Sequence, residues 1–256
     1  MDASAESSFD LTRDDLLAIE RAAVHAWPAS ETRNIAGWLW RYSGGGSQRA
    51  NSVSPLAFHG SDAIAAIEEA EELYFSRGGV SRFQVGSELA APADLDLQLE
   101  RRGYRLEEPV TTLARHLRQS SWPVGIEITD QPTAGWMEVY LSNIAPNRHD
   151  AAPAILASVP APRMFLSYVS GGQIVSTALA VLHNDIVVAE CIGTRAEARR
   201  TGGARRVMAA LEAWGAAQGA RIAALQAVTA NGPARRFYAA LGYASVNSYH
   251  YRVRDR

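Results

Sequence analysis

The chain has 256 residues, a net charge of −2 and a hydrophobic fraction of 47%. This is the composition of a folded globular protein, and the length allows one large domain or two of ordinary size. All 25 basic residues are arginine, which excludes mechanisms that need a Schiff-base lysine or a phosphate-binding Walker lysine. This charge balance also excludes a chain built mainly to attract nucleic acid.

No uncharged apolar run reaches about 18 residues, so the sequence predicts no membrane-spanning helix. The opening MDASAESSFDLTRDD is acidic and polar, without the apolar core of a signal peptide. Cys191 is the only cysteine, which excludes an internal disulfide and favours a cytoplasmic location. No cysteines and histidines have the spacing of a metal site, so we expect no metal cofactor.

The N-terminal half shows two helix–strand pairs. Before them, the aromatic segment GWLWRY (37–42) is typical of a sheet core, and SGGGS (43–47) predicts a flexible connection or hairpin between strands. The periodicity then predicts a helix at 60–78, a strand at 81–86, a helix at 93–104 and a strand at 110–117. RQSSWP (118–123) ends in a proline, and we place a domain boundary there.

The C-terminal half begins with two short helical patterns, at 133–145 and 149–158. Strands at 164–170 and 173–184 follow, joined by Gly171-Gly172, which is a strong hairpin signal. IVVAECI (186–192) predicts a strand in the middle of a sheet. The remaining expected elements are a helix at 204–219, a strand at 221–228, a helix at 232–242 and a strand at 245–253.

The two halves repeat each other. The turn LERRGY (99–104) aligns with YAALGY (238–243), and in each half a long helix starts about 41 or 42 residues before the final tyrosine. Equal spacing and matching element order predict a duplicated domain.

RRTGGARR (199–206) lies between the strand at 186–192 and a helix. The first amides of a helix have no intrahelical acceptor, and the helix dipole adds partial positive charge there. Glycines allow an anion to approach the backbone closely, and arginines add charge-assisted hydrogen bonds. The segment therefore predicts an anion site, with a basic surface loop as the alternative. Walker and dinucleotide-binding patterns are both absent.

Two motifs decide between these alternatives. The segment fits R-x-x-G-x-A, with Arg199, Gly202 and Ala204. The string N-x-x-A-x-x-F-Y-x-x-L-G-Y follows about 27 residues later, as Asn231, Ala234, Phe237, Tyr238, Leu241, Gly242 and Tyr243. Together they resemble the acetyl-CoA-binding motifs of the GNAT superfamily of N-acetyltransferases. The match covers residues 120–256 in element order and is specific over 186–243, although Arg200 and Gly203 replace a common glycine and a common aliphatic residue.

The resemblance implies an α/β (α+β) fold whose mixed, mostly antiparallel sheet splays at one point, with the pantetheine arm of CoA in the gap. We expect two such domains flanked by helices: a degenerate one without a CoA motif at 1–118 and a catalytic, acetyl-CoA-binding one at 119–256. It further implies that the backbone amides of Thr201, Gly202, Gly203, Ala204 and Arg205 hold the pyrophosphate, with Arg199 and Arg205 as charge contacts. Arg200 and Arg206 are expected either to be solvated or to contact the 3′-phosphate of CoA. The backbone of Cys191, Ile192 and Gly193 is expected to pair with the pantetheine arm. Asn231 and Phe237 complete the expected cofactor-binding residues, and Asn231 is equally expected to cap the helix that follows it.

Tyr238 is the candidate general acid, because expulsion of a thiolate needs a proton and a phenol can supply it. The alternative is a purely structural aromatic side chain. Glu190, a carboxylate within an apolar strand, is the candidate base that removes the proton of the amine, with a salt bridge to an arginine as the equal alternative. His183, Asp185 and His250 are weaker candidates, and Cys191 is expected to pack rather than react.

The N-terminal half lacks this chemistry. FHGSD (58–62) aligns with the anion loop but has no arginine, and Leu99 aligns with Tyr238. We expect this half to support the active domain and to wall part of the acceptor pocket, with GWLWRY and RANS (49–52) as contributors. The expected activity is direct acetyl transfer from acetyl-CoA to an amine on a small molecule or peptide, by a monomer or homodimer. The alternative is a non-catalytic acyl-CoA sensor or scaffold.

Overall fold

A computed structural model describes residues 10–256. Most of the opening segment MDASAESSFDLTRDD, which we expect not to be a signal peptide, therefore lies outside the described residues. The first half contains α1 (Arg13–Ala26), β1 (Glu31–Ile35), β2 (Trp38–Tyr42), the 3-10 turn η1 (Arg49–Asn51), α2 (Ala63–Phe75), β3 (Ser81–Gly86), α3 (Leu95–Arg101) and β4 (Arg105–His116). The second half contains β5 (Ile126–Thr129), α4 (Ala134–Leu141), η2 (Pro146–Arg148), α5 (Ala152–Ser158), β6 (Arg163–Ser170), β7 (Gln173–His183), β8 (Ile186–Thr194), η3 (Ala196–Ala198), α6 (Gly203–Ala217), β9 (Ile222–Val228), α7 (Gly232–Ala239) and β10 (Ala244–Arg254).

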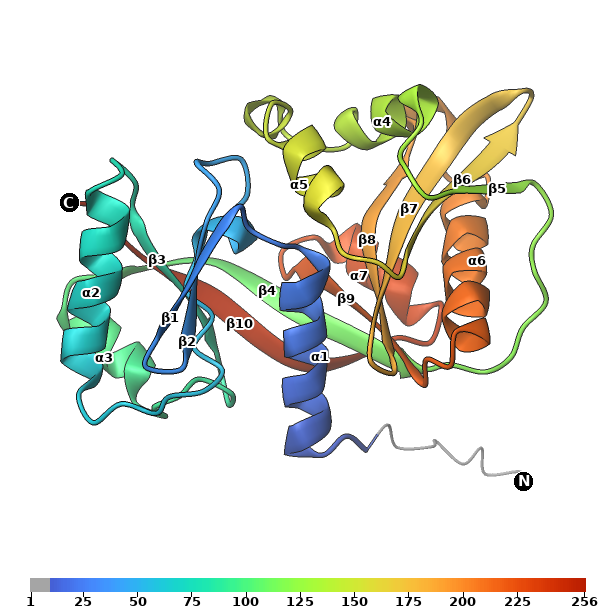
Figure 1. Ribbon diagram of the computed structural model, residues 1–256. Coiled ribbons are helices and arrows are strands. Elements are labelled where there is room, and N and C mark those ends of the chain that lie inside the picture. The colour runs from blue at the N-terminus through green and yellow to red at the C-terminus, as the bar shows by residue number, and fades with distance from the viewer. Residues whose placement is uncertain (1–9) are drawn as a thin grey trace.

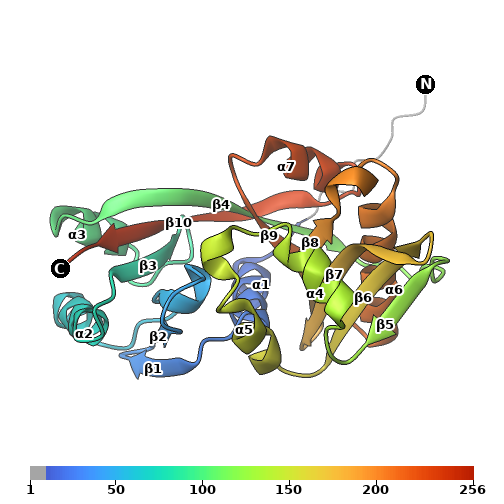
Figure 2. The same ribbon diagram turned by 90° about the horizontal axis from the view of Figure 1, so that it is seen from above.

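One eight-stranded sheet runs through both halves, in the order β3-β10-β4-β9-β8-β7-β6-β5 (Figure 1). Its strands pair antiparallel except for β8 and β9, which confirms the expected α/β fold with a mixed, mostly antiparallel sheet. The C-terminal strand β10 lies between β3 and β4 of the first half, and Figure 2 shows β4 and β10 side by side along the molecule. Each half therefore contributes strands to a shared sheet, where the sequence had suggested one sheet for each.

Helices cover both faces of the C-terminal strands. On one face α1, α4 and α5 pack on β7, β8 and β9 around the buried Trp136. On the other face α6 and α7 pack around Met208, Leu211 and Tyr238. The first half has its own apolar cluster between α2, α3 and β3, in which Trp38 and Trp40 are fully buried, as expected for GWLWRY.

Helix α1 is an element that the sequence analysis missed. Thr12 and Asp15 form a reciprocal capping box at its start, and Ile19, Ala22 and Ala26 present a buried apolar face at helical spacing. This face packs on strands of the second half, just as β10 packs on strands of the first. The predicted boundary at residues 118–123 falls in the connection between β4 and β5, and the division into two domains stays a prediction.

The two predicted repeat turns have the same geometry. Gly103 and Gly242 both have a positive φ, of 82° and 85°, and the next amides, those of Tyr104 and Tyr243, each donate to a carbonyl five residues earlier. The hydroxyl of Tyr104 donates to Glu71 of α2, and that of Tyr243 donates to Glu212 of α6. The two turns thus share their geometry and their tyrosine–glutamate bonds, and the duplication itself stays a prediction.

The other differences are local. SGGGS follows β2 and leads into η1, so it connects a strand to a 3-10 turn, which corrects the expected connection between strands. Several helices end earlier than predicted; α7, for example, ends at Ala239 because the turn at Gly242 begins there.

Candidate active site

The predicted anion loop opens helix α6. Gly202 is its N-cap residue with φ 91°, and the preceding Arg200 also has a positive φ, of 64°. Gly202 has no side chain with which to cap the helix, and among residues 10–256 no acceptor meets the amides of Thr201 to Arg205. Five amides at a helix start therefore remain available for an anion.

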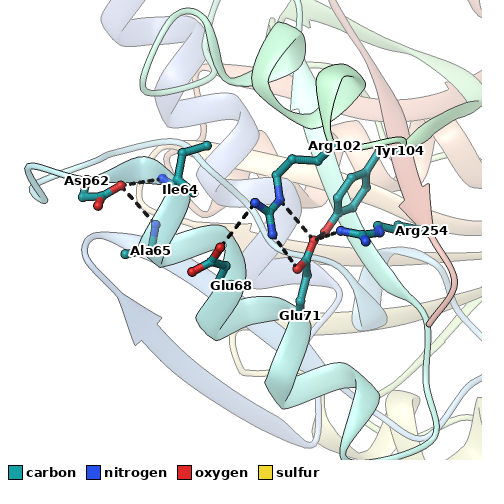
Figure 3. A network of polar contacts seen from close by, with 8 residues as sticks. All are labelled: Asp62, Ile64, Ala65, Glu68, Glu71, Arg102, Tyr104 and Arg254. Carbon is teal, nitrogen blue, oxygen red and sulfur yellow. Dashed lines mark hydrogen bonds and ion pairs between the residues drawn. The ribbon is translucent and has the colours of Figure 1, made fainter.

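The matching loop of the first half fills the same position with its own side chain. Asp62 is the N-cap of α2, and one of its carboxylate oxygens accepts from the amides of Ile64 and Ala65 at 2.9 and 3.1 Å (Figure 3). A carboxylate there occupies the helix start that an external anion would need. The first half is thus closed to such a ligand at the point where the second half is open.

Arginines surround the open loop. Arg199, Arg200, Arg205 and Arg206 are all exposed, and none of them has a carboxylate partner among the described residues. Arg206 lies over the ring of Tyr168, 5.0 Å from the ring centroid. The loop therefore carries uncompensated positive charge beside its free amides.

Two glycines bring α6 close to the sheet. A Cβ on Gly203 would lie 2.2 Å from Oγ of Ser176, and a Cβ on Gly215 would lie 2.6 Å from Cγ1 of Val187. This close packing fixes the start of α6 on β7, at Ser176, and its last turns on the beginning of β8, at Val187. It also explains why glycine stands at Gly203, where the family commonly has an aliphatic residue.

Strand β8 leaves its neighbour at the expected place. Parallel pairing with β9 extends only from Ile186 to Val188, while β9 continues along β4 to Val228. From Ala189 onward, no strand within residues 10–256 pairs with the β9-facing edge of β8. A bulge follows, where Cys191 has φ 54° and the register with β7 shifts between Glu190 and Gly193. This open edge is the gap expected to receive the pantetheine arm.

A cavity of about 170 Å³ lies at this gap. Glu190, Cys191 and Ile192 of β8 line it, together with Tyr238 of α7 and Tyr140 of α4. The structure therefore brings both predicted catalytic residues together with two of the three predicted backbone positions.

Tyr238 is 8% exposed, and its ring packs against Phe237 and Tyr243. Its hydroxyl forms no hydrogen bond within residues 10–256. Burial, together with the nearby charge of Glu190, raises the pKa of Tyr238 to about 12. The phenol is therefore protonated at neutral pH and has a proton to donate. Phe237 packs on the same core cluster.

Glu190 forms an ion pair that joins the two halves. Both of its carboxylate oxygens accept from Arg49 of η1, at 2.6 and 2.7 Å, and the guanidinium lies over the ring of Trp27. The side chain of Glu190 is 7% exposed. The salt bridge left open by the sequence is therefore present, and its partner comes from the segment RANS of the first half.

The other sequence candidates lie in separate contacts. Asn231 caps α7, since its Oδ1 accepts from the amide of Ala234 at 3.1 Å. His183 stacks on His25, Asp185 pairs with Arg221, and His250 bonds to Asp96. These three weaker base candidates do not line the small cavity. Cys191 does line it, and burial raises the pKa of its thiol well above the usual value, as expected for a packed, unreactive cysteine.

Sequence reasoning missed several residues around the cavity, among them Tyr140, Arg148 and Gln226. Gln226 of β9 accepts from Tyr249 and donates to the buried Glu20 of α1. No motif marks these positions, because α4, the loop after it and β9 meet only through the tertiary fold.

Among residues 10–256, no group of three or more His, Cys, Asp or Glu side chains is arranged to hold a metal ion. None of the helices in that range has the length and apolar character needed to cross a membrane.

Comparison with known proteins agrees with this geometry. Residues 14–254 match the family described as "Probable histone acetyltransferase Rv0428c C-terminal". The chain is 28% identical, over 94% of its length and 99% of the relative's, to an uncharacterized N-acetyltransferase, YobR, of Bacillus subtilis. In fold it is similar to a GCN5-related N-acetyltransferase from Kribbella flavida, with a TM-score of 0.68, 16% identity and 93% of each chain covered. A tandem GNAT protein from the clavulanic acid biosynthesis pathway gives a TM-score of 0.59 at 13% identity, over 80% of this chain and 75% of that one.

The chain therefore belongs to this acetyltransferase family, within the GNAT superfamily of N-acetyltransferases. It is an acyltransferase, and members of this superfamily use acetyl-CoA as the acyl donor.

Proposed function

We propose that the protein transfers an acetyl group directly from acetyl-CoA to an amine, with Tyr238 as general acid. The observation that carries the proposal is the unbonded hydroxyl of Tyr238, a residue that lines the small cavity where β8 leaves β9. The amine nitrogen attacks the thioester carbon, a C–N bond forms and the C–S bond breaks. The sulfur leaves with the electron pair and takes the Tyr238 proton, while the nitrogen loses a proton.

Acetyl-CoA fits the residues that surround this point. We assign its pyrophosphate to the free amides of Thr201 to Arg205, with Arg199 and Arg200 beside them, and its pantetheine arm to the open edge of β8 at Cys191, Ile192 and Gly193. The Asn231 amide nitrogen remains available, because only its oxygen caps α7.

Glu190 is the proposed base. An amine with a pKa near 10.4 is neutral in only about one molecule in a thousand at pH 7, so attack needs a proton acceptor. Arg49 takes one lone pair from each Glu190 oxygen, which leaves further lone pairs for the amine or a bridging water. In this proposal Arg49 is a positioning residue that fixes the carboxylate toward the cavity.

We also propose that the first half is a degenerate copy that supports the second. Asp62 blocks its anion loop, and Leu99 stands where the second copy has Tyr238. The first half instead supplies Arg49 to the active site and α1 to the core of the second half.

The test is acetyl-CoA turnover by the purified protein with a panel of amines. The buffer is reducing, because we propose a cytoplasmic location for the protein. Because the family description names a probable histone acetyltransferase, the panel includes a lysine-containing histone-tail peptide beside small amines. Direct transfer predicts equal amounts of free thiol and acetylated amine. Calorimetric binding of acetyl-CoA with no thiol release from any amine would favour the non-catalytic sensor, and absence of binding would overturn both.

A further inference from the structure

A larger cleft adjoins the small cavity. It has a volume of about 810 Å³ and lies between the two halves, lined by the SGGGS loop, the end of α2, β3, β9 and β10. Arg49, Arg148 and Gln226 line both spaces. The cleft therefore adjoins the space lined by Glu190 and Tyr238, and its volume suits a small molecule.

The arginines that line this cleft differ in their partners. Arg49 pairs with Glu190, and Arg77 pairs with Glu31. Arg82 and Arg148, in contrast, have no carboxylate partner within residues 10–256.

The contacts that these two arginines do make leave much of each guanidinium free. Arg148 donates through Nε to the carbonyl of Gly46, and Arg82 donates through one terminal nitrogen to the carbonyl of Asn51. The Nε of Arg82 is buried without any partner. A buried guanidinium nitrogen without an acceptor is costly, and a guanidinium without a carboxylate partner can bind an anionic ligand through its terminal nitrogens.

A third guanidinium lies just behind the cleft wall. Arg41 is 1% exposed, and its guanidinium partners within residues 10–256 are neutral: the backbone and side chain of Ser52 and the side-chain oxygen of Gln84. Its backbone carbonyl accepts from the hydroxyl of Tyr74, which lines the cleft. Among the described residues, the only carboxylate side chain lining the cleft is that of Glu108, which is exposed to solvent. The cleft thus carries an excess of fixed positive charge.

We propose that the acceptor is a small amine that also carries a carboxylate or phosphate group, which Arg82 and Arg148 bind while the amine reaches Glu190. The assignment rests on the proposed acetyl transfer. It follows from two adjoining spaces: the smaller one holds Tyr238 and the Glu190 carboxylate, which keeps lone pairs for the amine beside its ion pair with Arg49, and the larger one holds guanidiniums without acidic partners for the anion. A lysine-rich peptide would meet these arginines with charge of the same sign.

The test uses amines that differ only at the far end. Hexylamine, 6-aminohexanoate, 6-aminohexyl phosphate and 1,6-diaminohexane, together with their four-carbon homologues, are compared by thiol release. We expect kcat/KM for at least one anionic amine to exceed that of the uncharged amine of equal length by about tenfold or more. The better of the two anions distinguishes carboxylate from phosphate.

Variants assign the effect to the cleft. Arg82→Gln and Arg148→Gln should each reduce the preference for the anionic amine, and Arg82→Lys should retain part of it, because charge remains without the forked geometry. Arg221→Gln is the matched control, since Arg221 is exposed and pairs with Asp185 outside both cavities. Thermal melts show which variants stay folded.

The possible failures are distinguishable. Turnover in which hexylamine or the diamine equals or exceeds the anionic amines would overturn this inference and leave acetyl transfer intact. The inference would also fail if Arg82→Gln weakened acetyl-CoA binding while the amine preference was unchanged, because the cleft would then hold CoA. Absence of acetyl-CoA binding and of thiol release with every amine would overturn the proposed function itself, and this inference with it.

Discussion

An aspartate at position 202 should place a negative charge at the anion site, at the N-cap position that Asp62 occupies in α2. Gly202 has φ 91°, and among non-glycine residues asparagine and aspartate tolerate this region best. Gly202→Asp and Gly202→Asn therefore form a matched pair that share shape and backbone strain but differ in charge. The difference between them isolates the electrostatic part of pyrophosphate binding.

The expected size of this difference follows from Coulomb's law. Two unit charges about 5 Å apart at an effective dielectric constant of about 40 interact by about 1.7 kcal/mol, and a pyrophosphate carries two such charges. Salt at about 0.15 M screens roughly half of that energy. About 1.8 kcal/mol remains, so the Kd of acetyl-CoA should be about 20-fold higher for Gly202→Asp than for Gly202→Asn.

Calorimetric titration with acetyl-CoA measures this ratio, and circular dichroism melts confirm that both variants are folded. The ratio should narrow as salt is raised, because the effect is electrostatic. Equal Kd values for the two variants at low salt would refute the assignment of the pyrophosphate to the start of α6.

Three further predictions concern the acid, its titration and the packing of α6. Tyr238→Phe should lower kcat in the thiol-release assay by about 100-fold or more. Tyr243→Phe is the control, which should cost about 1 kcal/mol of stability and leave kcat unchanged. Equal kcat values for the two variants would show that Tyr238 is not the acid. The protonated phenol of Tyr238 is the active form, present below a pKa of about 12 and lost above it, so the kcat of the wild-type protein should not fall near pH 10. A fall near pH 10 that is absent from Tyr238→Phe would contradict the raised pKa of Tyr238. Gly215→Ala should lower the free energy of unfolding, measured with urea, by about 1–3 kcal/mol, because its Cβ would lie 2.6 Å from Val187. Gly135→Ala is the control and should lower it less, since the nearest atom to its Cβ is the flexible end of the Ile174 side chain. Similar losses of stability for the two variants would disprove the steric argument.

Local signals in the sequence were enough for much of the catalytic half. Alternation and hairpin glycines located β6, β7 and β8, and Gly202 marked the start of α6 within a residue. The string from Asn231 to Tyr243 identified the family because these residues perform their roles within one helix and one turn. Tyr238 and Glu190 do line one cavity, as the motifs implied.

Long-range features were not predictable in this way. The insertion of β10 between β3 and β4 depends on which edges remain unpaired after folding, which no local pattern records. For the same reason the partner of Glu190 was not foreseen: Arg49 is 141 residues away in sequence. The same holds for the cleft, whose arginines come from separate elements of both halves.

A crystal structure with CoA bound tests the central claim most directly. We predict the pyrophosphate on the amides of Thr201 to Arg205, the pantetheine arm along the open edge of β8, and the sulfur within hydrogen-bonding reach of the Tyr238 hydroxyl. The large cleft between the halves should remain free for the acceptor. CoA bound in that cleft, or with its sulfur directed away from Tyr238, would contradict the account.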